Sequence, residues 1–415
     1  MKYILLLLLH FTSQQIFAGP QPEITSVNPV RADGFTAVTP NDFKKGTDSD
    51  RIEKAIQDAV QKGINSIVIP RFDEVNEKAT WLIDRAIVLP SDFTLFLTDC
   101  FIRLAPGTRD NIITNSGARS NPLSENRNIR IIGRGNVVLS GGLESHYENP
   151  GDKNGYTTIG ILLYNTKYFT IEGIRMEETQ CWAISMENGC AFGRLSNIDF
   201  SNTWQYPNQD GIDIRKGCHD IMIENITGTT GDDLIAMTGM RDINLDWKEE
   251  TRQVREGRQK PSMQVGGRGW REEDDIYNIT INNVKGTTVG RQCCSLIRLL
   301  NHDGVKIYNI FINNIMDTAK DGEGATDQAI NIGDDHPYWK SARNQLGETS
   351  RIFIDNVIST APTVVRIRGT LKDSRLTKIV GYGKNVNPRK YSSNGLIQYG
   401  SEAELENVKI DAYQY

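Results

Sequence analysis

The sequence predicts an all-β fold, a right-handed parallel β-helix in which short strands stack as successive rungs of a solenoid. Three observations support this prediction. A short β-branched phrase recurs from residue 128 onward, which is typical of a repeat architecture. Most copies are followed by a second short strand with two-residue alternation, and no helix of the length that a βαβ crossover needs separates them. The 37 glycines among 415 residues suit a turn-rich β protein.

The recurring phrase ends in Gly, Asn or Asp followed by Ile or Val. Its copies span residues 169–174, 194–198, 221–226, 279–284, 310–315 and 352–357. The turn residues of successive copies are separated by 24, 28, 58, 31 and 42 residues, which predicts rungs of about 20 to 30 residues with insertions and one doubled interval. The rival fold is a β-propeller, whose blades need hairpin turns such as Asn-Gly or Asp-Gly, and these are scarce here.

The first 18 residues have the organisation of a signal peptide. Lys2 precedes an apolar run at residues 4–9, and a short polar stretch then leads to Ala18. A transmembrane anchor needs about 18 apolar residues, whereas this run stops at His10. We therefore expect a secreted or periplasmic protein with no membrane span, in which residues 19–415 form a single β-helix domain.

A solenoid needs a cover at its end, and residues 50–62 supply one as a short amphipathic helix. The apolar stripe of this helix and the glycine that closes it are Ile52, Ala55, Ile56, Ala59, Val60 and Gly63. The rhythm of strands is broken at residues 240–275, which are densely charged. We expect this insertion to form a loop on the coil surface, either as a wall of a binding cleft or as an ordinary insertion.

The charge and cysteine content exclude several classes of partner. The 52 acidic and 47 basic residues nearly cancel, and no long block of one sign is available to bind phosphates, so nucleic acid is not an expected partner. Six cysteines are too few for a disulfide scaffold, and no CxxC pair suggests zinc. We expect neither a cofactor nor a bound metal; one or two disulfides and the oligomeric state stay open.

Three aspartates form the most informative cluster in the sequence. Asp210 and Asp232 are 22 residues apart, so if one rung takes that many residues, they stack about 5 Å apart, with Asp233 beside them. Carboxylates gathered in this way repel one another, which raises at least one pKa and keeps a proton available for cleavage of a glycosidic bond. Two alternatives stay open, because aspartates also favour turns and also bind calcium.

The residues around these aspartates carry a family resemblance. The segments in question are 181–184, 196–198, 208–214, 221–225 and 231–236. In order and spacing they resemble glycoside hydrolase family 28, the polygalacturonase-like enzymes with a pectinase-type β-helix. The resemblance extends over most of residues 33–360, and its specific part is residues 181–239. It implies an inverting hydrolase in which Asp210 and Asp233 activate water while Asp232 protonates the leaving oxygen.

Two family features do not transfer to this chain. Arg291 stands where the histidine of a Gly-His-Gly segment is expected, and the nearest counterparts of an Arg-Ile-Lys segment are residues 329–333 or 366–368. Arg291 and Arg298 are therefore the candidates for binding an acidic sugar; if both point away, a neutral sugar such as galactose or rhamnose is expected. Three further substrate-binding candidates complete the set, namely Trp204, Asn208 and His302.

The sequence as a whole thus predicts a secreted inverting glycoside hydrolase that acts on a pectic or related polysaccharide. Two rivals remain. A polysaccharide lyase of the same fold would need calcium and an Arg or Lys base. A non-catalytic carbohydrate-binding β-helix would use the carboxylates only as turn residues.

Overall fold

The computed structural model describes residues 37–108, 110–120, 123–142, 159–179, 181–202, 209–239, 272–289, 294–319, 326–334, 343–361, 363–382 and 395–414. Contacts within the chain separate Met1–Ala37 from a compact unit, Val38–Tyr415. The predicted signal peptide and most of the charged insertion lie outside the described residues. Within them, no helix combines the length and the apolar character needed to cross a membrane.

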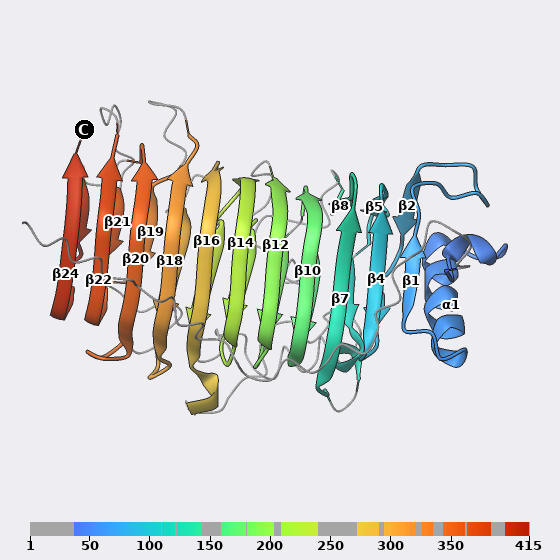
Figure 1. Cartoon of the computed structure of the whole chain (residues 1–415), viewed down its shortest axis with the longest axis horizontal. Helices are drawn as coiled ribbons and strands as arrows, with labels where there is room; N and C mark the ends of the chain where they lie inside the picture. Colours follow the sequence, from blue (N-terminus) through green and yellow to red (C-terminus); the bar gives the residue numbers. More distant parts are fainter. Residues whose placement is uncertain are drawn as a thin grey trace, which may run out of the picture. The chain divides into compact units, whose positions relative to one another are not determined.

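The unit Val38–Tyr415 is a right-handed parallel β-helix, as predicted, and its named strands pair in parallel within two sheets (Figure 1). The ten-stranded sheet contains β3 (Ile87–Leu89), β6 (Ile113–Asn115), β9 (Ile161–Tyr164), β11 (Ile184–Glu187), β13 (Ile212–Arg215), β15 (Ile235–Gly239), β17 (Ser295–Asn301), β19 (Gln328–Ile332), β21 (Thr363–Ile367) and β23 (Gly395–Tyr399). The second sheet contains β1 (Ser66–Ile69), β2 (Thr80–Ile83), β4 (Phe93–Thr98), β5 (Phe101–Leu104), β7 (Asn126–Arg134), β8 (Val138–Ser140), β10 (Thr166–Glu177), β12 (Ala191–Ser201), β14 (His219–Thr230), β16 (Ile276–Thr288), β18 (Ile307–Asp317), β20 (Thr349–Ser359), β22 (Thr370–Gly381) and β24 (Glu404–Gln414).

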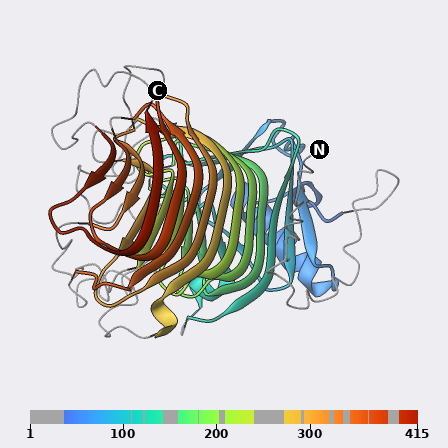
Figure 2. The ribbon, with the colours of Figure 1, turned by 60° about the vertical axis from the view of Figure 1, so that its left-hand side comes forward.

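The long strands of the second sheet curve round one side of the coil (Figure 2). They bend where the recurring phrase has its Asn, because that residue takes a left-handed backbone conformation, with φ of 56° at Asn225 and 58° at Asn283. The amide of Asn283 donates to that of Asn225 over 2.6 Å, and equivalent bonds link further rungs. These asparagines therefore form a ladder along the coil, and the strand continues through each of them instead of ending there.

Strand pairing reproduces the intervals between the repeats. Ile223 pairs directly with Ile281, so the doubled interval of 58 residues is a single rung, and the charged insertion at residues 240–275 accounts for its length. Of that insertion the structure describes only the end, which includes the 3₁₀ helix η4 (Glu272–Asp274). The strands therefore meet across the insertion without losing a rung.

Alternation along the ten-stranded sheet separates core from exterior. Ile212, Ile235 and Ile297 are in register on adjacent strands and have no exposed surface. Because successive side chains of a strand point to opposite faces, the next residues in each strand lie on the outer face. We call this set the outer row: Ser185, Asp213, Ala236, Arg298, Asn331, Arg366 and Gln398.

The predicted cap helix is present as α1 (Asp48–Gln61), beside β1 (Figure 1). It starts two residues earlier than predicted because Thr47 caps it: the Thr47 hydroxyl accepts from the Asp50 amide, and the Asp50 carboxylate accepts from the Thr47 amide. Four of the five predicted stripe residues are buried, but Val60 is 51% exposed, since it lies at the edge of the stripe.

The remaining short helices are η1 (Pro40–Asp42) and η2 (Ser116–Arg119). The five described cysteines are buried free thiols.

Candidate active site

The three predicted aspartates come together at the start of two adjacent strands. Asp210 precedes β13, and the pair Asp232 and Asp233 precedes β15. Ile212 pairs with Ile235, which puts Asp210 level with Asp233 and not with Asp232, as the 22-residue spacing had suggested. The Gly211 amide donates to the Asp233 carbonyl over 2.9 Å. Asp232 occupies the turn before β15, and this extra turn residue accounts for the difference.

A fourth carboxylate, that of Asp213, joins this cluster. It lies in the outer row on β13, between Ile212 and Ile214, whose side chains enter the core. Electrostatic repulsion couples it to Asp210 and Asp233. Asp213 was not among the predicted site residues, although alternation within the Asp-Gly-Ile-Asp-Ile motif places it on the outer face.

The four carboxyl groups differ in their access to solvent. Asp210, Asp213 and Asp233 are buried, with 6%, 1% and 1% exposed surface, whereas Asp232 is only partly buried. The three predicted groups lie close enough to repel one another, but only Asp232 has appreciable exposed surface. The partly exposed carboxyl group of Asp232 can exchange a proton with a ligand or with solvent.

Burial and mutual repulsion alter the proton affinity of the cluster. Burial, and then the Asp233 carboxylate, raise the pKa of Asp232 to about 7. Burial, and then the charges of Asp213, Asp232 and Asp233, hold the pKa of Asp210 well above its usual range. Burial does the same to the pKa of Asp213, with Arg215 acting in the opposite direction. The cluster therefore retains protons at a pH at which isolated aspartates are ionised.

Asp233 is the member that is best stabilised as an anion. Its Oδ1 accepts a hydrogen bond of 2.6 Å from the Ser295 amide, and its Oδ2 lies 3.4 Å from Nη1 of Arg298. Burial raises the pKa of Asp233 above its usual value, and Arg298 and the Ser295 amide limit that increase. By contrast, Oδ1 of Asp210 is buried with no hydrogen-bond partner among the described residues. One cluster thus contains both a stabilised carboxylate and groups that favour the protonated form.

Arg298, predicted as a substrate-binding residue, belongs to a chain of charges on the outer face. Its Nη2 lies 3.4 Å from Oδ2 of Asp334, and Oδ1 of Asp334 lies 2.8 Å from Nη1 of Arg368. The side chain of Asp334 has no exposed surface, whereas that of Arg298 is 22% exposed. Arg298 therefore contacts Asp233 on one side and Asp334 on the other.

Of the other predicted substrate-binding residues, the structure describes His302. His302 follows β17 directly, its backbone amide donates to the Gly239 carbonyl, and burial lowers the pKa of its ring. Trp204, Asn208 and Arg291 lie outside the described residues.

Trp182, which lies one rung before Asp210, is 6% exposed and stacks under the guanidinium of Arg215 at 4.7 Å. It belongs to a small apolar cluster with Ile159, Leu162 and Cys181. A packing role accounts for this side chain.

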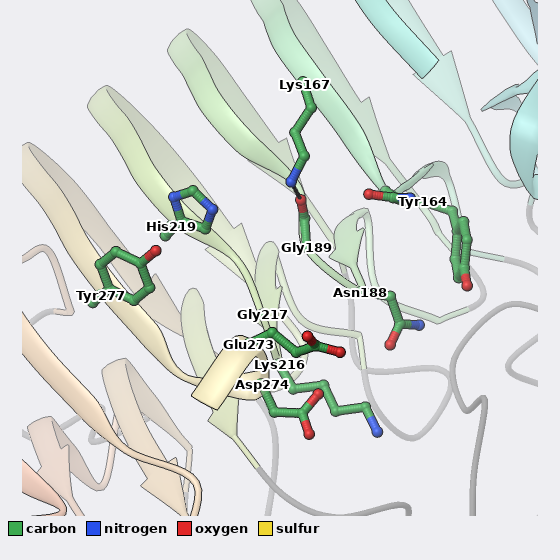
Figure 3. Close-up of a pocket in the computed structure, with 11 residues that line it drawn as sticks. Tyr164, Lys167, Asn188, Gly189, Lys216, Gly217, His219, Glu273, Asp274 and Tyr277 are labelled. Carbon is green, nitrogen blue, oxygen red and sulfur yellow. Dashed lines mark hydrogen bonds between the residues drawn. The ribbon is translucent and has the colours of Figure 1, made fainter. Parts of the chain in front are cut away.

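A separate polar pocket of about 400 Å³ lies beyond the other ends of β9, β11 and β13 (Figure 3). Lys167 and Lys216 line it, together with Glu273 and Asp274 of η4, so the charges of these four side chains balance. On one wall, His219 stacks on Tyr277 with ring centres 4.7 Å apart. The pocket contains no member of the aspartate cluster, because the cluster precedes β13 and β15 whereas the pocket follows β13.

Comparison with protein families gives one match. Residues 123–316 match the model described as Glycosyl hydrolases family 28. The matched segment contains Asp210, Asp213, Asp232, Asp233 and Arg298. It confirms the resemblance that the sequence motifs predicted. No curated protein sequence matches the chain.

Solved structures share the fold at low sequence identity. A hyperthermoactive exopolygalacturonase from Thermotoga maritima is 18% identical, with a TM-score of 0.53 and coverage of 91% of this chain and 92% of that chain. An endo-xylogalacturonan hydrolase from Aspergillus tubingensis is 12% identical, with a TM-score of 0.55 and coverage of 91% and 93%. A tailspike protein of E. coli bacteriophage HK620 in complex with pentasaccharide is also 12% identical, with a TM-score of 0.56 and coverage of 91% and 63%.

Proposed function

We propose that this chain, whose residues 123–316 match glycosyl hydrolases family 28, hydrolyses glycosidic bonds of a pectic or related polysaccharide with inversion at the anomeric carbon. The observation that carries this proposal is the contrast within one aspartate pair. Asp232 is partly exposed with a pKa raised to about 7, whereas Asp233 is buried and stabilised as an anion by Arg298 and the Ser295 amide. Inverting hydrolysis needs one acid and one base of this kind.

Asp232 acts as the general acid. Its pKa, raised to about 7, leaves a large fraction of the carboxyl group protonated near neutral pH, and its partly exposed surface allows contact with a glycosidic oxygen. The proton passes to the leaving oxygen as the bond to the anomeric carbon breaks. Asp232 is left as a carboxylate and recovers its proton from solvent.

Asp233 acts as the general base. It takes a proton from a water molecule as the water oxygen bonds to the anomeric carbon, on the face opposite to the leaving group. Asp210 is level with Asp233 on the adjacent rung and helps to position that water by hydrogen bonding. Because the acid and the base are different groups and no covalent intermediate forms, the product has the inverted configuration.

An acidic sugar fits the rungs that follow the aspartates. Arg298, Arg366 and Arg368 lie there, and Asp334 contacts the first and the last of them. Arg366 lies in the outer row, three rungs or about 14 Å beyond Ala236. Two of the structures with this fold are described as an exopolygalacturonase and an endo-xylogalacturonan hydrolase. We therefore favour a substrate that contains uronate.

Such polymers lie outside the cell that degrades them, which agrees with the signal peptide predicted at residues 1–18. Export to the periplasm or the medium therefore belongs to the proposal. The secreted form should have a mature N-terminus near residue 19, as N-terminal sequencing can establish.

Incubation with a panel of defined pectic and neutral oligosaccharides tests the proposed activity. Wild type should release reducing ends without the ultraviolet absorbance of a new double bond, and a chelator should not change the rate. Absorbance that disappears with the chelator would identify a lyase instead, and binding without cleavage would identify a carbohydrate-binding protein. Arg366→Gln should raise KM for the uronate-containing members of the panel and leave KM for the neutral ones unchanged.

A further inference from the structure

We infer that Asp334 is a positioning residue for the hydrolysis, because it is the counter-ion that fixes Arg298 beside Asp233 and limits the effect of the arginine charge on the aspartate pair. This inference rests on the proposed function, in which Asp232 is the acid and Asp233 the base. Asp334 itself contacts neither of them; it acts through Arg298.

The geometry brings residues of four successive rungs into one chain of charges. Asp233 precedes β15, Arg298 lies within β17, Asp334 follows β19 and Arg368 follows β21. The Asp233–Arg298 and Arg298–Asp334 separations are both 3.4 Å, so the guanidinium is shared between two carboxylates. Arg368 approaches the other oxygen of Asp334 at 2.8 Å, which fixes the orientation of that carboxylate.

Burial strengthens the interactions between these charged side chains. The side chain of Asp334 is fully buried, that of Asp233 is 1% exposed and that of Arg368 is 8% exposed. Charges in such an environment are screened much less than charges at a surface. Removal of the Asp334 charge therefore leaves the charges of Arg298 and Arg368 without their common counter-ion.

Other charged and titratable groups face the same region. Asp210 and Asp213 approach the pair from β13, and both carry raised pKa values because burial and the neighbouring carboxylates disfavour their anions. His302 follows β17, and burial lowers the pKa of its ring, so it is neutral near pH 7. Among the described residues, Arg298 is the cation found in contact with Asp233, so its compensation by Asp334 bears directly on the base.

The sign of the effect follows from the charges. Arg298 lowers the pKa of both Asp232 and Asp233, since a nearby cation stabilises a carboxylate. Asp334 opposes this influence. In Asp334→Asn the guanidinium of Arg298 loses the Asp334 charge and should stabilise both carboxylates further, so both limbs of the bell-shaped profile of kcat against pH should move to lower pH. In Arg298→Gln both limbs should move to higher pH.

The test compares the pH profiles of kcat for wild type, Asp334→Asn, Arg298→Gln and a control, Asp317→Asn. Asp317 is a buried aspartate at the end of β18 that accepts from the Ala319 amide and the Ser359 hydroxyl, in the other sheet. We expect Asp334→Asn to shift both limbs down by about one pH unit, and Asp317→Asn to leave both limbs in place. Asp334→Glu, which retains the charge, should restore the profile in large part.

A second measurement needs no turnover. Carbon-13 NMR of aspartate-labelled protein follows the titration of Asp232, which the spectrum of Asp232→Asn identifies. Its midpoint should fall in Asp334→Asn and rise in Arg298→Gln. If the midpoint of Asp232 moves as expected but the protein cleaves no glycan, the role of Asp334 in the chain of charges would stand and the proposed function would be rejected.

Two outcomes would overturn the inference. Limbs and titration midpoints that stay in place in Asp334→Asn, with kcat lowered equally at every pH, would make Asp334 a structural residue only. A shift to higher pH, as in Arg298→Gln, would show that Asp334 strengthens the influence of the arginine instead of limiting it.

Discussion

Asp210 and Asp233 lie level with one another on adjacent rungs of the coil, because Ile212 pairs with Ile235 two residues further along each strand. This relationship brings one buried carboxyl group next to another that Arg298 and the Ser295 amide stabilise as an anion. Asp232, in the intervening turn, is the partly exposed member of the set. The division of labour between acid and base follows from this placement.

The general acid is the residue whose loss should affect turnover most. Asp232→Asn should lower kcat by about 10² to 10⁴, because an amide cannot donate the proton that the leaving oxygen needs. The melting temperature should stay the same or rise, since one source of repulsion is removed. Asp355→Asn, an exposed aspartate on β20, is the matched control and should retain full activity. Wild-type kcat in Asp232→Asn would remove this residue from the mechanism.

The pKa of Asp232 predicts how activity depends on pH. Burial and the Asp233 charge raise this pKa to about 7 in the free protein, so kcat/KM should fall as pH rises through about 7 and the acid loses its proton. Initial rates on a cleavable oligosaccharide between pH 4 and 9 measure this limb. A profile that is flat across neutral pH would show that another group donates the proton.

The stability of the fold should also respond to pH through Asp213. Its folded-state pKa is raised well above the value of an unfolded aspartate, mainly by burial, so the unfolded chain releases this proton first as pH rises. Stability from this group is therefore present below about pH 4 and declines between that pH and the folded-state pKa.

Asp213→Asn removes this titration. The loss of melting temperature between pH 5 and pH 8 should be smaller in the variant than in wild type, as measured by differential scanning calorimetry. An equal loss in both proteins would mean that Asp213 ionises in the folded state without penalty.

The asparagine ladder should stabilise the fold mainly through backbone conformation. Asn283 has a φ of 58° and donates to Asn225 over 2.6 Å. Asn283→Ala should cost about 1 to 2 kcal/mol in the free energy of unfolding, because a Cβ disfavours this conformation and the hydrogen bond is lost. Asn283→Gly loses the same bond without the Cβ penalty and should be less destabilising in urea unfolding. Equal destabilisation by the two variants would show that the lost amide contact dominates, and a larger loss in Asn283→Gly would contradict the role given to backbone conformation.

The sequence was sufficient for the features that depend on local pattern. Ile223 and Ile281 enter the core, and Asn225 and Asn283 lie at the bends of their two adjacent strands, so the interval between these repeats agrees with the strand register. The cap helix followed from its apolar stripe in the same way. Val60 was misjudged because it stands at the edge of that stripe, where a single sequence does not separate core from solvent.

Features that depend on contacts between rungs could not be predicted from the sequence. The register of Asp210 with Asp233 depends on how many residues the intervening turn absorbs, which spacing alone does not determine. The contact of Arg298 with Asp233 and Asp334 joins residues separated by 65 and 36 positions, and the first of these separations includes the long insertion. Which rungs are adjacent across that insertion becomes visible only in the strand pairing.

Proton NMR of the products at early times tests the central claim most directly, that Asp232 and Asp233 act as acid and base in an inverting hydrolysis. Wild type should release a reducing sugar whose first detectable anomer is opposite in configuration to the bond that was cleaved, and Asp232→Asn and Asp233→Asn should each release almost none. Release of the retained anomer, or of an unsaturated sugar, or undiminished release by either variant, would contradict the account.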